Sequence, residues 1–77
     1  MNREELKQKL EELNVYPGFY SLNGELLPDR IVLNHNYDKW EVFYFDERGN
    51  RDSEKTFSSE NDACNYIYRY FIRQKGI

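Results

Sequence analysis

The residues that could do acid–base or nucleophilic chemistry are few in this chain. His35 is the only histidine and Cys64 the only cysteine among 77 residues. A general base must lie within hydrogen-bond reach of a nucleophile or a carboxylate, and no catalytic partner adjoins His35 in the sequence. Cys64 follows Glu60 and Asp62, whose charges oppose thiolate formation. We therefore expect a turn histidine, a buried packing cysteine, and no catalytic residue, metal or cofactor.

Aromatic residues are the abundant type, with 7 Tyr, 5 Phe and 1 Trp. A chain of this length buries only about 60% of the surface that its unfolded form exposes, which is too little for two separate cores. Each large ring can bury roughly 150–250 Å², so a few of them can supply most of one core. We expect a single domain over residues 1–77, in which most rings are structural.

The charge balance points away from nucleic acids as partners. There are 14 acidic and 11 basic residues, giving a net charge of -3, whereas binding to phosphates relies on lysine and arginine. The N-terminus is too charged for a signal peptide, and no stretch approaches the roughly 18 apolar residues of a membrane span. One cysteine cannot form an intrachain disulfide. These features favour a cytoplasmic protein, monomeric when free, that does not bind membranes.

Two amphipathic helices are predicted, one near each end. Asn2 and Glu5 have the spacing of a capping box, and Asn14 can end the first helix in the left-handed conformation. Its apolar positions are Leu6, Leu10 and Leu13. Ser58 and Ser59 can cap the second helix, which Gly76 would end. Its apolar stripe is Ala63, Ile67, Tyr70 and Phe71.

Strands are predicted between the helices. Residues 19–22 and 25–27 flank Asn23-Gly24, the dipeptide that best suits a two-residue hairpin turn. Pro28 stops the return arm. Further strands are expected at 30–34, 39–45 and 55–57, separated by polar segments at 35–38 and 46–50. The predicted fold class is α+β: a three- to four-stranded antiparallel meander, with both helices packed on one sheet face.

The strand at 39–45 carries apolar residues on both faces. Trp40, Val42 and Tyr44 alternate with Phe43 and Phe45, and we assign the first set to the core. The second set then forms an exposed aromatic patch on the open face, unless a helix or the first hairpin covers it. Acidic residues of the neighbouring turns, including Glu25 and Asp29, would rim this patch. The predicted partner-binding residues are Tyr37, Asp38, Glu41, Phe43, Phe45, Asp46 and Glu47.

Several short blocks distributed over about residues 13–72 together resemble a set of small bacterial proteins. The blocks are Tyr20-Ser21-Leu22-Asn23-Gly24-Glu25, Pro28-Asp29, Val32-Leu33-Asn34, Trp40-Glu41-Val42-Phe43-Tyr44, Glu47-Arg48-Gly49 and Phe57-Ser58-Ser59-Glu60-Asn61-Asp62-Ala63-Cys64. In these blocks, the chain resembles immunity proteins of polymorphic and contact-dependent growth inhibition toxin systems. The blocks are turns and core strands, so the resemblance transfers no binding residue.

The resemblance implies a cytoplasmic antidote that binds the C-terminal domain of a cognate toxin. In many such systems that domain is a nuclease, and an RNA-cleaving one is the first expectation here. An acidic, aromatic-bearing domain suits the basic cleft of a nuclease, which it would block by occlusion. The alternative is a non-catalytic adaptor or regulatory subunit that takes up a peptide on the open sheet face or at a sheet edge.

Overall fold

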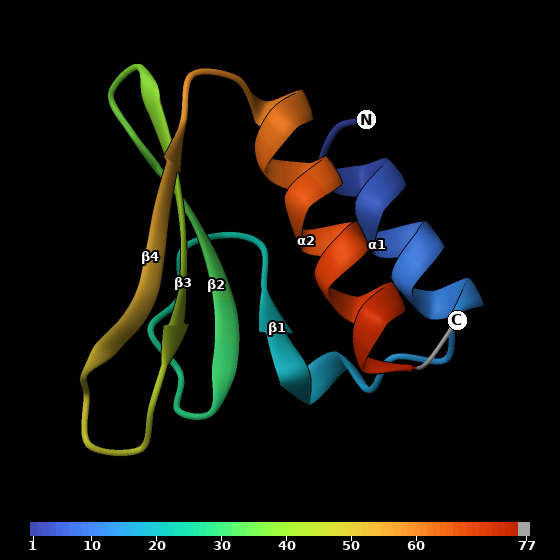
Figure 1. Ribbon diagram of the computed structural model, residues 1–77, viewed down its shortest axis with the longest axis horizontal. Helices are drawn as coiled ribbons and strands as arrows, with labels where there is room; N and C mark the ends of the chain where they lie inside the picture. Colours follow the sequence, from blue (N-terminus) through green and yellow to red (C-terminus); the bar gives the residue numbers. More distant parts are fainter. Residues whose placement is uncertain (76–77) are drawn as a thin grey trace.

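The chain folds into two layers, a sheet and a pair of helices, as the computed structural model of residues 1–75 shows (Figure 1). The elements in order are α1 (Arg3–Glu12), the 3₁₀ helix η1 (Pro17–Phe19), β1 (Tyr20–Ser21), β2 (Arg30–Asn36), β3 (Lys39–Phe45), β4 (Arg51–Phe57) and α2 (Glu60–Gln74). Over these residues the strands form one sheet in the order β1-β2-β3-β4. Both helices cover the same face of it, so the predicted α+β class is confirmed.

Side-chain caps begin both helices where the sequence predicted. The Asn2 side chain accepts a hydrogen bond from the Glu5 amide, and the Glu5 carboxylate accepts one from the Asn2 amide. Asn14 follows α1 with a φ of 60°. The Ser59 hydroxyl accepts from the Asp62 amide at the start of α2. Gly76, which was expected to end α2, lies outside the described residues.

The predicted first hairpin is wrong. β1 pairs with β2 in parallel, Tyr20 opposite Ile31, and residues 25–27 form no strand. After β1 the chain passes round the sheet edge to the side away from the helices before β2 begins (Figure 1). The physical reason is burial, because this path places Tyr20 against Phe71 of α2, with ring centroids 6.2 Å apart. The sheet is therefore mixed, with antiparallel pairing only from β2 to β4.

β2 runs two residues further than predicted, and His35 lies in it. Its ring stacks on that of Trp40, the residue opposite it in β3, with centroids 3.9 Å apart and planes at 4°. The connector between these strands is correspondingly short. Tyr37 and Asp38 alone form the turn, and Tyr37 has a φ of 58°. The expectation of a histidine in a turn is therefore wrong, since His35 contributes a cross-strand ring pair instead.

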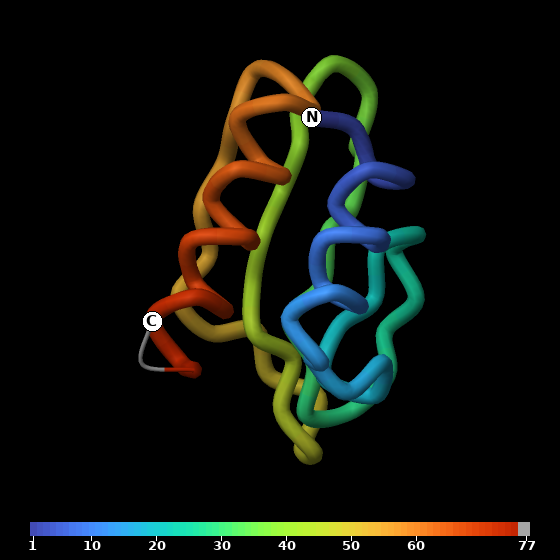
Figure 2. The backbone as a smooth tube through the Cα atoms, turned by 90° about the vertical axis from the view of Figure 1, so that its right-hand side faces the viewer, coloured from blue at the N-terminus to red at the C-terminus, as the bar shows by residue number. Residues whose placement is uncertain are grey.

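The core fills the space between the two layers. Its buried members come from both helices, from the segment after α1, from β1 and from the helix-facing sides of β2 and β3. They are Leu6, Leu10, Val15, Tyr20, Ile31, Leu33, Val42, Ala63, Cys64, Ile67 and Phe71. Figure 2 shows the two helices from their own side, with the strands behind them. Trp40 and Tyr44 are partly buried against this core, as predicted. None of the helices within residues 1–75 is long and apolar enough to cross a membrane.

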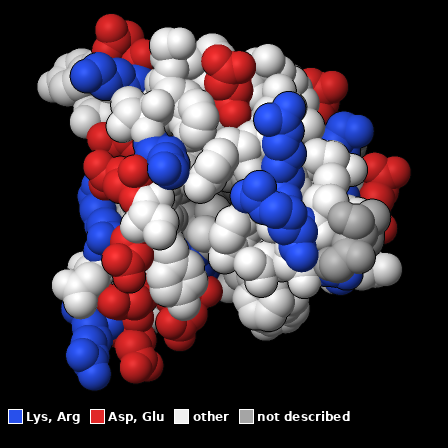
Figure 3. All heavy atoms as spheres, viewed as in Figure 1, with Lys and Arg blue, Asp and Glu red and all other residues white. Residues whose placement is uncertain are grey.

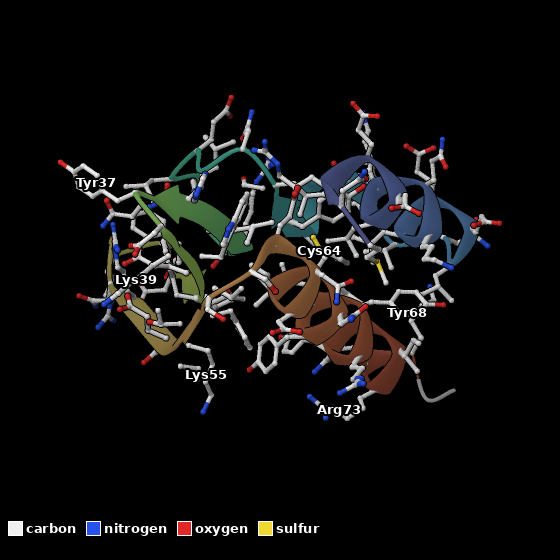
Figure 4. All side chains as sticks on the ribbon, turned by 90° about the horizontal axis from the view of Figure 1, so that it is seen from above. Tyr37, Lys39, Lys55, Cys64, Tyr68 and Arg73 are labelled. Atoms are coloured by element: carbon white, nitrogen blue, oxygen red, sulfur yellow. The ribbon has the colours of Figure 1, made fainter. Side chains whose placement is uncertain are left out.

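Cys64 confirms the prediction of a packing residue. It is fully buried, and in Figure 4 its side chain lies in the interior between the helices and the sheet. Burial, and secondarily the charge of Glu60, raises the pKa of its thiol to about 11. The thiol is therefore protonated at neutral pH.

Candidate functional site

The two turns predicted to contribute acidic residues to one rim lie at opposite ends of the sheet. Tyr37 and Asp38 occupy the turn between β2 and β3, whereas Asp46 and Glu47 occupy the turn between β3 and β4. The seven residues of β3 separate these turns, a length of about 20 Å at roughly 3.3 Å per residue. Tyr37 is 92% exposed and projects from its turn away from the helices (Figure 4). The predicted contact residues in these two turns therefore do not form one continuous rim.

Phe43 does not form part of an exposed patch, so that prediction is wrong. Its side chain is only 1% exposed, although it lies on the sheet face away from the helices, opposite Val32 of β2. The Arg51 guanidinium lies 4.3 Å from its ring centroid. The segment between β1 and β2 reaches the same face, because a Cβ at Gly24 would lie 2.8 Å from Oδ1 of Asn34. The alternative of a covered face therefore holds, although no hairpin provides the cover.

The other predicted residues of β3 and its following turn are partly engaged within the molecule. Glu41 is partly buried and accepts a hydrogen bond of 3.0 Å from the Asn34 side chain. Phe45 is also partly buried. Asp46 accepts hydrogen bonds from the backbone amides of Arg48 and Asn50, which lower the pKa of its carboxyl group. These contacts within the chain stabilise the sheet and its turn in the free protein.

The structure instead offers an open groove on the helix-covered side of the sheet. One hollow, of about 440 Å³, lies between the β3–β4 edge and α2, and a second, of about 700 Å³, continues beneath the end of α2. Both are lined by Ile31, Tyr44 and Tyr70, so they meet at this pair of tyrosines. We call the two hollows together the tyrosine groove. Further lining residues are Val42, Asp52, Ser53 and Tyr66 in the first hollow, and Tyr16, Phe19, Asp29 and Lys75 in the second.

Tyr44 lies where the hollows meet and is held there by Asp29. Its hydroxyl donates a hydrogen bond of 3.0 Å to Oδ1 of Asp29. This bond is the main reason that the pKa of Tyr44 is raised, with smaller contributions from burial and from the charges of Asp29 and Asp46. The hydroxyl therefore stays protonated at neutral pH. The Asp29 backbone is fixed as well, since its amide donates to the Phe45 carbonyl at 2.7 Å.

A β-bulge in β4 brings a second carboxylate to Tyr44. Val42 pairs with Lys55 and Tyr44 with Asp52, so β4 has one more residue than β3 between these pairs. Ser53 adopts a φ of 54° within this irregularity. Regular pairing would have set Ser53 opposite Tyr44, whereas the extra residue sets Asp52 there. Cβ atoms of such opposed residues lie about 5 Å apart, and both Tyr44 and Asp52 line the first hollow.

The carboxylates near Tyr44 have no basic partner within the described part of the chain. The ion pairs found in residues 1–75 join Arg3 to Glu60 and Arg51 to Glu54, and neither involves Asp29, Asp46 or Asp52. Figure 3 shows several acidic side chains, with some basic ones among them, over the lower sheet, and basic side chains over α2, with uncharged surface between the two groups. Within residues 1–75, no three or more His, Cys, Asp or Glu residues are arranged to hold a metal ion.

Sequence reasoning found Asp29 as an acidic residue but missed the groove. Alternation correctly placed Tyr44 towards the helices, yet a core-side residue was not considered as part of a binding site. Asp52 carries no local signal, because only the bulge sets it beside Tyr44. The chain matches no family model, no curated protein and no solved structure.

Proposed function

We propose that this chain is an immunity protein that binds and neutralises a cognate toxin domain in the cytoplasm. The observation that carries the proposal is the group of carboxylates, Asp29, Asp46 and Asp52, that lie around the partly exposed Tyr44 and form no ion pair within residues 1–75. An acidic surface with rings in it is complementary to the basic cleft of a nuclease, and an RNA-cleaving toxin is the first class to test. The resemblance of the sequence blocks to immunity proteins agrees with this class.

The mechanism is occlusion without chemistry. Charge attraction brings the acidic end of the sheet to the basic cleft and raises the association rate, while rings removed from water slow dissociation. The end formed by Asp29, Tyr44, Asp46 and Asp52 replaces the open-face patch as the contact surface, because Phe43 is buried. Glu47 lies in the same turn as Asp46 and extends the acidic surface.

The test is co-expression of this chain with the toxin domain encoded next to its gene, scored by cell survival. Survival with this chain, and death with an unrelated small acidic protein in its place, is the expected result. The purified pair should associate more slowly as salt is raised, because screening weakens steering between charged surfaces. Death of the co-expressing cells, with no complex between the purified proteins, would overturn the proposal.

A second candidate, a peptide-binding adaptor, is favoured by one observation. β4 is an edge strand, and six of its seven residues are exposed, so its outer backbone groups could pair with an added strand. The bulge and the alternating charges of β4 oppose such pairing, however, as they do on edges protected from aggregation. A regulatory operon around the gene would favour the adaptor, and an upstream toxin gene the immunity protein.

A further inference from the structure

We propose that the tyrosine groove binds an arginine side chain of the partner protein, stacked against Tyr44 between the carboxylates of Asp29 and Asp52. This inference deepens the proposed function and takes from it only the class of partner, a basic protein. It adds a specific occupant and a specific position.

The groove has an apolar floor and polar walls. Ile31 and Val42 line it from the sheet, and Tyr66 and Tyr70 line it from α2. The three methylenes of an arginine can lie along such a floor while the charged end stays near water. The second hollow continues past Phe19 and Tyr16, which are 54% and 65% exposed. A stretch of partner chain can therefore follow the arginine along the groove.

The charges at the centre of the groove favour a cation. Asp29 and Asp52 flank Tyr44, the first by a hydrogen bond and the second by strand register, and neither forms an ion pair within residues 1–75. Basic residues lie nearby, among them Lys75 and Lys55, but none of those in residues 1–75 forms an ion pair with Asp29 or Asp52. Lys75 lines the second hollow, but its Nζ donates to the Asn14 carbonyl, and Lys55 projects outward from β4 (Figure 4). The carboxylates at Tyr44 are thus left for an external cation.

Arginine fits this arrangement better than lysine does. A planar guanidinium can lie flat on a tyrosine ring and still direct N–H groups to carboxylates at its edges, whereas an ammonium cannot stack. The protein already contains this kind of contact, since Arg51 lies over the Phe43 ring on the opposite face. The Tyr44 hydroxyl orients the ring by its bond to Asp29, which leaves the remaining lone pairs of that carboxylate for the incoming cation.

The first experiment uses the whole chain and three capped tripeptides, Gly-Arg-Gly and its citrulline and lysine counterparts. Citrulline keeps the shape of arginine and removes its charge. Titrations followed by amide NMR should show saturable shifts at Tyr44, Asp52, Ser53 and Tyr70 with the arginine peptide. We expect binding roughly tenfold weaker with citrulline, as is typical when one charged hydrogen-bonded pair is lost. Equal binding of the two, or shifts confined to Tyr37 and Asp38, would overturn the inference.

The second experiment uses the variant Asp29→Asn/Asp52→Asn. Asparagine tolerates the φ of 59° at position 29 and can still accept the Tyr44 bond, so the fold should persist. Asp38→Asn, at the far end of the sheet, is the matched control. The double variant should lose the preference for arginine over citrulline, and the control should keep it. An unchanged preference in a double variant that melts like the wild type would contradict the inference.

The two proposals fail separately. If the wild type protects cells from the neighbouring toxin and the double variant protects equally well, the protein is an immunity protein but the groove is not where an arginine binds. If the wild type selects the arginine peptide yet gives no protection, the groove is a binding site and the immunity function is wrong.

Discussion

The two ends of the β-sheet carry similar residues but differ in what surrounds them. At one end Tyr37 and Asp38 form a two-residue turn, and the Tyr37 ring is almost fully exposed. At the other end Tyr44 is partly buried against the core, is bonded to Asp29, and is opposed by Asp52. A ring that is already ordered loses little rotational freedom on binding, whereas a free one must be immobilised. Position in the fold, and not residue type, therefore makes the Tyr44 end of the sheet the better candidate for a binding site.

The largest expected effect tests the assignment of Phe43 to the interior. Phe43→Ala should lower the free energy of unfolding by about 3–5 kcal/mol, because it leaves a cavity on a covered face. Urea unfolding followed by circular dichroism measures this. A surface anchor would instead leave stability nearly unchanged and weaken only the binding of the partner, which would return Phe43 to the list of contact residues.

Charge reversal compares the two ends of the sheet directly. Asp52→Lys should weaken binding of the proposed toxin partner by about 2 kcal/mol, roughly thirtyfold, because it removes a carboxylate and places a cation opposite Tyr44. Calorimetry or surface plasmon resonance gives the affinity. Asp38→Lys makes the same charge change at the other end and should leave the affinity close to that of the wild type. The reverse ranking of these variants would move the contact surface to the Tyr37 turn.

A smaller effect is expected from Tyr44→Phe. The substitution removes the hydroxyl that donates to Asp29 and should lower the stability only slightly at neutral pH, because this hydrogen bond is exposed to solvent. The pKa of Tyr44 is raised in the folded state, so its contribution is complete below the unfolded value of about 10 and is lost as pH rises through the folded value. The fall in melting temperature from below pH 10 to above pH 10 should therefore be smaller for the Tyr44→Phe variant than for the wild type. An equal alkaline loss in both proteins would show that the bond contributes little.

The smallest effect is expected at the exposed turn. Tyr37→Ala removes a ring that is 92% exposed and should change stability by no more than about 0.5 kcal/mol, with toxin binding also unchanged. Thermal melting and the affinity assay used for Asp52→Lys measure both quantities. A loss of binding at constant stability would show that both ends of the sheet meet the partner.

Local sequence signals determined much of this fold. The capping side chains Asn2 and Ser59 act within three residues of themselves, so the starts of both helices could be read directly. Period-2 alternation placed Trp40, Val42 and Tyr44 towards the helices, and β3 has the predicted bounds. The lone buried cysteine was likewise predictable, since its acidic neighbours and its helical position are both local features.

Only the tertiary structure decided the parallel pairing of β1, the burial of Phe43 and the formation of the tyrosine groove. Asn23-Gly24 favours a hairpin locally, but burial of Tyr20 against Phe71, 51 positions further along the chain, favours another path. The bulge that sets Asp52 beside Tyr44 depends on how two strands pair, and no single segment encodes it. The physical reason is common to all three: each depends on contacts between residues distant in the sequence, and their energies outweigh the local preferences that a sequence displays.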